Sequence, residues 1–599
     1  MKNILACLLP ALLCSPGFSQ QPTPADNQTV IVTATFEPVP LSENDRSVRV
    51  FHTDQQPLLF NDLESYLRLD PSVDLQERGP GGVQADISIR GTTFEQSLVL
   101  LNGLRINDPE TGHLNMDIPV PLDAISRVEV LHGSGSTFYG SDALGGAVNL
   151  ITTEPQRTAV QAGIGYGNYG STEQHAVGAY LARHWSEQLS GSRETSSGFM
   201  IDRNYRTSAV SSETWLHTAL GSTDVLLAAS DRPYGANQFY GNFESFERTK
   251  GWFGSVRQQL GAKNEADFGY RRHTDVFTLL VYDPAVYQNN HIDTAWQGDL
   301  RRAERPGRNA TVAYGLEASG DGINSSNLGQ HARNQGAGYA SLDLRALKRL
   351  SLSIGAREEI FSGGDAVFSP TAAAGYWLGH GMRLHAAAGH AFRLPTYTDL
   401  YYSDPTTVGN PGLRPESAWS YEGGLQWESG GRISFDLTGF RLLERNGIDY
   451  SKFALSERWQ ATNVQNLDFT GAETTVHLRL PASQQVELGY TGLHASQQPV
   501  PGLISEYAFN YASQNASFAW SGEFAHRVDA RTQVSIVQRV GQTAYPLWDL
   551  SVAGSGGRVR PYLRFSNLSN TGYEEVPGVP MPGRTIMGGA EFFWARNRR

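Results

Sequence analysis

Apolar and polar residues alternate over most of the chain. The segment RISFDLTGF places Ile433, Phe435 and Leu437 on one face and polar residues on the other. Segment 474–480 (TTVHLRL) repeats the pattern, and segment 583–594 (GRTIMGGAEFFW) repeats it more loosely. A period of two predicts strands with one apolar and one polar face. Clusters of Gly, Asn, Asp, Ser and Pro separate these strands, and no extended helical period lies among them.

Residues 45–158 have a different sequence pattern, which is typical of a small domain of mixed helices and strands. A capping Asn-Asp pair and helically spaced apolar residues predict a helix over 61–67. Short β-prone runs with glycine punctuation predict strands in 87–91 (ISIRG), 97–106 (SLVLLNGLRI) and 127–133 (RVEVLHG).

The stretch YGSDALGGAVNLIT (139–152) closes this domain and carries Gly140, Gly145 and Gly146 immediately before its strand. Glycine weakens a strand unless another backbone approaches closely. We therefore expect tight packing here, as in a small domain held against a surrounding wall.

Two architectures fit the alternating region, namely a large soluble β-sandwich array or propeller and a transmembrane barrel with a polar lumen. The barrel is favoured by a secretory leader, by 10% aromatic residues and by the absence of a propeller-length repeat. Residues 159–599, at about 20 residues per strand with its connection, predict on the order of 22 strands. The predicted fold is a membrane all-β protein, a large antiparallel transmembrane β-barrel with a small α+β plug domain in its lumen.

The N-terminal sequence is typical of a secreted precursor. Lys2 precedes an apolar run over 4–13, and Gly17-Phe18-Ser19 provides small residues for cleavage, which predicts a signal peptide over 1–19. Both cysteines lie in this leader, so the mature chain is expected to carry no disulfide. The formal net charge of -12 argues against a nucleic-acid partner.

A series of motifs, in the family's order, resembles those of TonB-dependent outer-membrane receptors. The plug motifs are Ile89-Arg90-Gly91, LVLLNGLRIND, ISRVEVLHG and the glycine-bearing stretch above. The barrel motifs are AFRLPTYTDLY with GNPGLRPESAWSYEGG, then NVQNLDFTGAE and YEEVPGVPMPGRT. The resemblance implies a gated importer in the cell outer membrane, embedded in its lipid, for a scarce small-molecule nutrient complex.

The resemblance also implies a coupling segment in the linker 20–44. TVIVTA, that is Thr29, Val30, Ile31, Val32, Thr33 and Ala34, resembles the family's TonB box. Such a segment adds a strand to the partner's sheet edge, and no proline interrupts it. We expect TonB, driven by the inner-membrane proton-powered complex, to pull here on a plug over 45–158.

In the family, two plug arginines pair with two barrel glutamates. The matching positions are Arg90 and Arg127 in the plug and Glu422 and Glu473 in the barrel. Buried charges must be paired, and breaking a pair is costly while its net worth is small. A reversible latch and simple structural fixation of the plug both remain open.

Substrate contact is expected at outward plug loops 78–85 and 107–115 and at barrel loop 234–247. Aromatic faces with scattered amides suit a large, partly apolar, near-neutral ligand. The expected contact residues are Gly82, Val83, Gln84, Asn107, Asp108, Thr111, His113, Asn237, Phe239 and Tyr240.

Among family members, the plug resembles cobalamin receptors most. Well-known cobalamin receptors bind calcium through aspartate-rich loops, whereas Asp202, Asp224 and Asp231 are scattered here. The alternative inside the family is a ferric siderophore receptor, in which arginines meet an anionic chelate. Arg78, Arg105 and Arg393 are the candidates for that contact.

Other chemistries find little support. His380, His385 and His390 are spaced by five, which puts them on alternating faces of a strand and argues against a shared metal site. No GxSxG, HExxH or Walker loop is present, so no enzyme activity, metal or cofactor is expected. A passive porin, the alternative from another class, would lack both the box and the plug.

Overall fold

The computed structural model describes residues 30–31, 39–497, 501–507, 510–525 and 527–596. The expected signal peptide lies outside these residues, as do Thr29, Val32, Thr33 and Ala34 of the expected box. Among the described residues, no helix has the length and apolar character needed to cross a bilayer.

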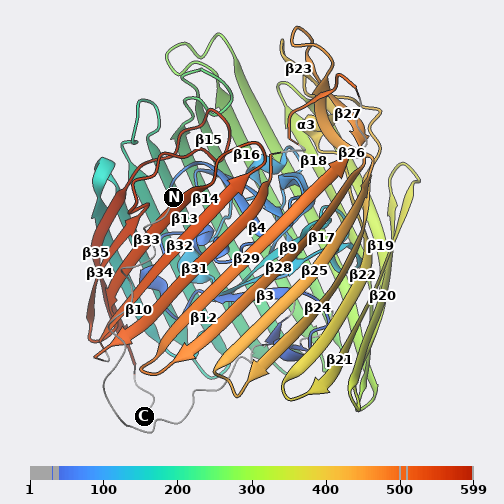
Figure 1. The fold of residues 1–599 in the computed structure, drawn as a ribbon, viewed down its shortest axis with the longest axis vertical. Coiled ribbons are helices and arrows are strands. Elements are labelled where there is room, and N and C mark those ends of the chain that lie inside the picture. The colour runs from blue at the N-terminus through green and yellow to red at the C-terminus, as the bar shows by residue number, and fades with distance from the viewer. Residues whose placement is uncertain (1–29, 32–38, 498–500, 508–509, 526, 597–599) are drawn as a thin grey trace, which may run out of the picture.

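Twenty-two antiparallel strands of the described chain close into one barrel, which confirms the predicted fold class (Figure 1). The first strand pairs with the last, from Ala159↔Ala595 to Gly167↔Met587. The barrel strands are β10 (Ala159–Gly167), β11 (Thr172–Leu181), β12 (Trp185–Ser196), β13 (Tyr205–Thr218), β14 (Gly221–Gly235), β15 (Phe246–Leu260), β16 (Asn264–Thr278), β17 (Gln288–Gly307), β18 (Ala310–Ser325), β19 (Gly329–Leu347), β20 (Leu350–Phe361), β21 (Ala366–Gly379), β22 (Met382–Arg393), β24 (Glu416–Ser429), β25 (Ile433–Arg445), β28 (Leu467–Leu480), β29 (Gln484–Gln497), β31 (Ala512–Phe524), β32 (Val528–Arg539), β33 (Tyr545–Gly554), β34 (Val559–Ser566) and β35 (Thr585–Ala595).

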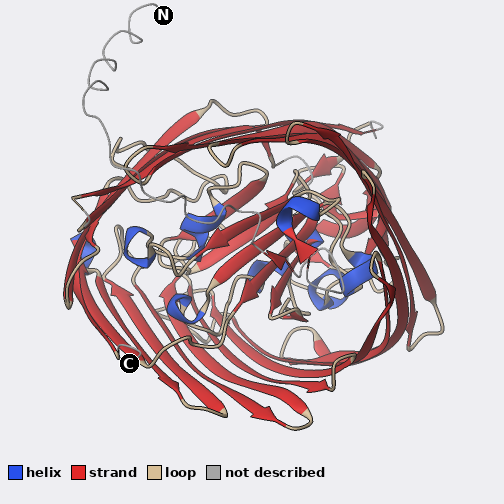
Figure 2. Ribbon diagram, turned by 90° about the horizontal axis from the view of Figure 1, so that it is seen from below, coloured by secondary structure: helices blue, strands red, loops and turns tan. Residues whose placement is uncertain are grey.

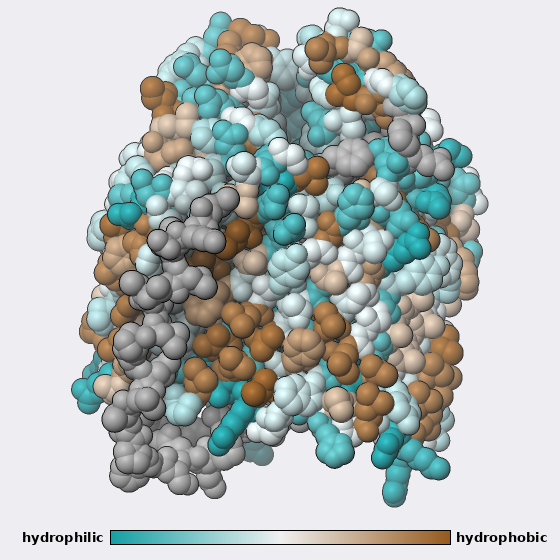
Figure 3. Space-filling model, in the orientation of Figure 1, coloured by the Kyte–Doolittle hydropathy of each residue, from teal (hydrophilic) through white to brown (hydrophobic). Residues whose placement is uncertain are grey.

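The two faces of the barrel wall differ as the alternation predicts. On β35, Ile586, Phe592 and Trp594 are exposed on the outer surface, while Glu591 is buried on the lumen side. Figure 3 shows apolar side chains concentrated over the lower outer wall, with hydrophilic side chains at the lower tips. An apolar outer surface around a polar lumen is the arrangement that a lipid bilayer requires of a barrel.

The two ends of the barrel carry connections of different length. At one end the strands join through short turns such as 308–309 and 348–349. At the other end, long loops carry α3 (Tyr397–Tyr401), β23 (Thr407–Val408), β26 (Gly447–Lys452), β27 (Trp459–Gln465) and β30 (Ile504–Ser505), at the top of Figure 1. Long loops face outward in outer-membrane barrels, so we refer to this end as the outer end.

The plug fills the lumen (Figure 2). Its five-stranded sheet has the order β3-β8-β9-β6-β7, and β4 and β5 form a separate hairpin. The predicted helix over 61–67 is confirmed as α1, with Asp62 accepting a hydrogen bond from the Ser65 amide. The plug elements are η2 (Leu41–Glu43), β3 (Val48–His52), η3 (Pro57–Leu59), α1 (Leu63–Leu67), β4 (Val73–Gly79), β5 (Gln84–Ile89), η4 (Phe94–Gln96), β6 (Ser97–Leu101), β7 (Leu104–Arg105), η5 (Gly112–Leu114), η6 (Leu122–Ala124), β8 (Arg127–His132), α2 (Ser136–Tyr139) and β9 (Gly146–Ile151).

The glycines of 139–152 serve two different close approaches. A Cβ at Gly140 would lie 2.6 Å from Glu359 Oε2, on the barrel wall, and Gly140 has φ +76. A Cβ at Gly146 would lie 2.0 Å from the Leu131 carbonyl oxygen, inside the plug sheet. The first glycine therefore lets the plug meet the wall, and the second lets β9 pair with β8.

Gly146→Val is expected to destabilise the plug by at least about 3 kcal/mol, because the clash is with backbone and no rotamer change relieves it. Hydrogen exchange of β8 and β9 measures the effect. Gly103→Ala is the matched control, since Gly103 also has a positive φ of 82 but its Cβ would meet nothing closer than 3.8 Å. Equal protection in both variants would contradict the assigned role of the Leu131 contact.

Candidate functional site

The plug is fastened to the barrel by a buried ion-pair cluster at Arg90. Its Nη1 lies 2.7 Å from Glu422 Oε2, and its Nη2 lies 2.5 Å from Glu473 Oε1. All three side chains are less than 10% exposed. The Ser47 amide and Ser72 hydroxyl supply further hydrogen bonds to the two carboxylates. We call Arg90, Glu422 and Glu473 the latch cluster.

The expected pairing of Arg127 with a barrel glutamate is wrong. Arg127 Nε lies 2.8 Å from Glu129 Oε1, within the plug. Residues i and i+2 of a strand share a face, so Arg127 meets Glu129 on β8 before it can reach the wall. The second plug cation at the latch cluster is His132 instead, with Nδ1 3.2 Å from Glu473 and Nε2 2.8 Å from Asp70.

His132 is held in its charged form. Burial alone would lower its pKa, but the carboxylates of Asp70 and Glu473 outweigh burial and raise the pKa of His132 to about 9. Burial would raise the pKa of Asp70, and His132 and Arg49 together hold it below the usual value. A group whose pKa is raised on folding stabilises the fold fully below its unfolded pKa, here 6.5, and loses that contribution as pH rises through about 9.

Plug protection is therefore expected to fall between pH 6.5 and about 9, by on the order of 3 kcal/mol from His132. Glu64 and Glu77 titrate in the same window, because burial raises their pKa to about 7 and about 8. The test therefore measures hydrogen exchange of β8 in the wild type and in His132→Gln, and compares the two proteins at each pH. Parallel pH profiles for the two proteins would contradict the assignment.

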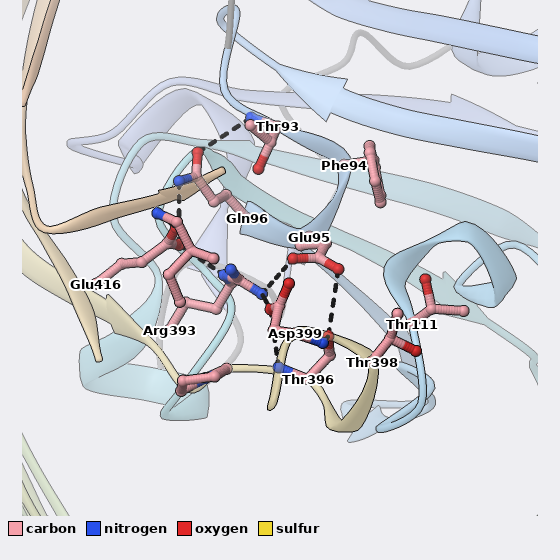
Figure 4. Close-up of polar contacts among 12 residues, drawn as sticks. Thr93, Phe94, Glu95, Gln96, Thr111, Arg393, Thr396, Thr398, Asp399 and Glu416 are labelled. Atoms are coloured by element: carbon pink, nitrogen blue, oxygen red, sulfur yellow. Dashed lines mark hydrogen bonds and ion pairs between the residues drawn. The ribbon is translucent and has the colours of Figure 1, made fainter. Parts of the chain in front are cut away.

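A second plug–barrel contact centres on Arg393, which points between three carboxylates (Figure 4). Its guanidinium pairs with Glu95 of the plug, with Asp399 at 3.1 Å and with Glu416 at 2.6 Å. The plug's Gln96 also donates to Glu416, at 3.1 Å. Arg393 is only 1% exposed, so in this conformation it binds the plug and offers no charge to an anionic ligand.

The other two candidate arginines are also neutralised. Arg78 lies 2.8 Å from Asp86 and is buried, and Arg105 pairs with Asp142. Burial would raise the pKa of Asp86, but Arg78 and His113 lower it to about 2. Each of these three arginines therefore already has a carboxylate partner.

The first outward plug loop meets the expected barrel loop at the outer end. Val83 and Phe239 belong to one buried apolar cluster, and the Tyr240 hydroxyl donates to Gln84 Oε1 at 3.0 Å. The second plug loop joins the first where His113 Nδ1 lies 2.8 Å from Asp86. The two plug loops and the barrel loop therefore form one surface, which we call the mouth.

The ten expected contact residues differ in access. The buried members are Val83, Gln84, Asp108 and Phe239. The half-buried members are Gly82, Asn107, Thr111, His113 and Asn237. Tyr240 is 41% exposed and is the only one of the ten that is more than about a third exposed. Their role in binding stays a prediction.

Aromatic residues from the outer end of β16, from other barrel loops and from η4 of the plug extend the mouth and were missed from the sequence. Phe277 lies edge-on to Tyr240 at 5.5 Å, and Tyr287 lies 6.5 Å from Phe277. On the plug side, His113 stacks on Phe94 at 4.2 Å, and Tyr507 lies edge-on to Phe94 at 5.5 Å. Aromatic residues in the long loops were the available signal, but the sequence does not show which of them turn inward.

A cavity lies below the mouth between plug and wall, with Asn107, Asp108, Arg271 and Trp296 among its lining residues. Its volume is about 80 Å³, enough for a few waters and far below the roughly 300 Å³ of a small ligand pocket. A molecule of that size therefore does not fit this cavity unless the plug moves.

The aspartates and histidines singled out in the sequence lie apart from one another. Asp231 is held by Arg206 and Arg248, each at 2.8 Å, and Asp224 lies seven residues away on the same strand, on the other face. His380 is exposed in a turn, while His385 is buried in the lumen. None of these residues belongs to a group with metal-ligand spacing in the described chain.

Comparison with known families matches almost the whole chain. The family described as "TonB-dependent Receptor Plug Domain" matches residues 41–147. The family described as "TonB dependent receptor-like, beta-barrel" matches residues 136–574.

Individual proteins give the same architecture with different named ligands. A vitamin B12 transporter BtuB of Vibrio vulnificus is 25% identical, over 97% of this chain and 98% of its own. The siderophore receptor PirA of Acinetobacter baumannii superposes with a TM-score of 0.75 at 15% identity, covering 91% of this chain and 98% of its own. The ferric enterobactin receptor PfeA of Pseudomonas aeruginosa gives 0.75 at 16% identity, covering 92% of this chain and 100% of its own. At such identity the two structures indicate the fold alone.

Proposed function

The chain belongs to the TonB-dependent receptor family, and from that premise we propose that it imports a cobalamin or related corrinoid across the outer membrane. The ligand binds at the mouth, and TonB pulls on residues 29–34 to move the plug from the lumen. The expected leader over 1–19 directs the chain to the periplasm, where the barrel inserts into outer-membrane lipid.

The chemistry of the mouth is the observation that carries the corrinoid proposal. Tyr240, Phe277, Tyr287 and Tyr507 provide aromatic faces beside the amides of the plug loops. A large, near-neutral, partly apolar complex is bound through such surfaces with few ionic contacts. The similarity to a protein named as a vitamin B12 transporter supports the same choice.

Two alternatives receive less support. An anionic ferric siderophore calls for unpaired cations, yet Arg78, Arg105 and Arg393 are each engaged by carboxylates. A passive porin needs an open lumen, and here the plug fills it (Figure 2).

Titration calorimetry of the detergent-solubilised protein with cyanocobalamin, with and without calcium, tests the proposal. We expect one ligand per chain and the same affinity in both conditions, because Asp202, Asp224 and Asp231 are scattered. Absence of cyanocobalamin binding together with binding of ferric enterobactin would replace the proposal by the siderophore alternative.

Tyr240→Ala is expected to weaken cyanocobalamin binding about tenfold, since the variant removes the exposed aromatic face at the centre of the mouth. Tyr180→Ala is the control, because Tyr180 is similarly exposed, at 49%, but lies near the inner end of β11. Calorimetry of both variants measures the difference, and equal affinities would place the ligand elsewhere.

A further inference from the structure

Two adjacent barrel strands present the same His-x-Asp pattern to the plug. β16 carries His273 and Asp275, and β17 carries His291 and Asp293. The antiparallel register places His273 opposite Asp293 and Asp275 opposite His291. Because alternate residues of a strand share a face, all four side chains lie on the lumen side, and all are buried.

The plug completes this arrangement with Glu110, from the second outward loop. One ligand-type atom from each of Glu110, Asp275 and His291 lies within 4.8 Å of the others, and all three residues are at least 95% buried. Glu110 Oε1 lies 3.3 Å from His291 Nδ1. The group therefore joins two strands of the wall to a plug loop.

Several polar atoms of this group have no hydrogen-bond partner within the described chain. They are Asp275 Oδ1, His291 Nδ1 and, apart from the contact that the Glu110 and Asp293 carboxyl groups make with each other, Glu110 Oε2 and both carboxylate oxygens of Asp293. Buried polar atoms in native proteins are almost always satisfied, so atoms left without a partner point to a missing one.

The charge balance points to a cation. Glu110, Asp275 and Asp293 bring three carboxylates together in a buried site. The nearby guanidinium groups are already paired, Arg271 with Asp108 at 2.9 Å and Arg232 with Asp117 at 3.2 Å. Buried carboxylates need a proton, a cationic partner or a metal ion.

We propose that Glu110, Asp275 and His291 bind one divalent transition-metal ion, of the class represented by Zn²⁺, with Asp293 as a further carboxylate ligand. A mixed imidazole and carboxylate donor set suits Zn²⁺ and its first-row neighbours, whereas calcium sites are built from oxygen alone. The ion binds to the protein independently of the nutrient at the mouth. This metal site is a property beyond the proposed import function.

The neighbouring group of Asp108, His273 and Asp293 does not fit a second ion as well. Arg271 already neutralises Asp108, and His273 lies between Asp108 at 2.8 Å and Asp117 at 3.1 Å. This histidine has a carboxylate at each ring nitrogen, so one ion per chain is the expected stoichiometry.

The ion would pin plug loop 107–115 to β16 and β17. Glu110 is the only member of the group that the plug supplies, so binding of the ion resists movement of this loop from the wall. Removal of the ion should increase hydrogen exchange in 107–115 while leaving β8 of the plug protected.

The test uses the full-length protein, dialysed against EDTA and titrated with Zn²⁺ by calorimetry and with Co²⁺ by visible absorption, without cobalamin. We expect one ion per chain with micromolar or tighter affinity, and at least tenfold weaker binding in His291→Gln and in Asp275→Asn. His385→Gln is the control, since His385 is an equally buried lumen histidine on β22. Circular dichroism identifies variants that form the barrel.

Three results would overturn the proposal, namely no binding by the wild type, equal binding by wild type and both ligand variants, or a preference for Ca²⁺ over Zn²⁺. The proposed import function fails separately, in the cyanocobalamin titration, so the two failures are distinguishable. Exchange in 107–115 that is unchanged by Zn²⁺ would overturn the pinning role.

Discussion

Deleting residues 29–34 is expected to abolish uptake of radiolabelled cyanocobalamin while leaving its binding at the cell surface intact. In the structure, the only pairing of the described box residues is a two-residue ladder, with Val30 opposite Pro40 and Ile31 opposite Val39. So short a ladder is readily exchanged for a longer one with a partner's sheet edge, which is the strand addition proposed for TonB. Binding is spared because the deletion removes no residue of plug loops 78–85 and 107–115 or of barrel loop 234–247, which form the mouth.

Single substitutions separate the backbone from the side chain in this step. Ile31→Pro removes an amide donor and should eliminate uptake, whereas Ile31→Ala keeps the donor and should retain much of it. Uptake by the deletion variant at the wild-type rate would refute the coupling role of the segment.

Arg90→Ala is expected to loosen the plug, with a larger conductance in planar bilayers and faster hydrogen exchange in β5. The substitution leaves Glu422 and Glu473 buried without their shared guanidinium, at a cost of about 3–5 kcal/mol. The lost contact with the Phe440 ring, 4.5 Å from the guanidinium carbon, adds to this cost.

Arg441→Ala is the matched control, because Arg441 on β25 forms an exposed pair with Asp468 and is 56% exposed itself. Such a solvent-exposed pair contributes little to stability, so conductance should not change. Adding Glu422→Gln and Glu473→Gln to Arg90→Ala should recover much of the plug protection, because the buried negative charges are then gone. Unchanged conductance in Arg90→Ala would leave the latch cluster with a packing role only.

The barrel was predictable because its physics is local. The alternation around Ile433, Phe435 and Leu437 indicates a strand with one face toward lipid and the other toward the polar lumen. Every strand that crosses the bilayer must show the same alternation. The plug was predictable in outline because caps such as Asp62 act within one turn. The pairing order of its sheet, in which β6 runs parallel to β9, depends on contacts between distant segments and was not predicted.

The latch cluster shows that the family resemblance alone does not identify which residues pair. Arg90 was placed correctly, but Arg127 pairs with Glu129 two residues along its own strand, and His132 approaches Glu473 instead. Which side chain meets a distant glutamate depends on the register between plug and wall. That register is set by packing between residues hundreds of positions apart, and no local sequence pattern indicates it.

The His-x-Asp pairs were a missed local signal. His273 with Asp275 and His291 with Asp293 each repeat at the period of a strand, which places both side chains of a pair on one face. Helical metal motifs and aspartate-rich loops do not describe ligands that lie on two antiparallel strands. Glu110 could not be identified as a ligand from the sequence, because it approaches the barrel wall only when the plug is folded inside the lumen.

The pairing of β10 with β35 also governs how the molecule assembles. Ala159 and Ala595 lie at opposite ends of the barrel sequence, so this seam has to be the last to close. Until then two open edges remain, and contacts between such distant residues form slowly. The plug is made first and must be inside the ring, or enter through its inner end, when the seam closes. The final strand therefore completes the wall that encloses the plug.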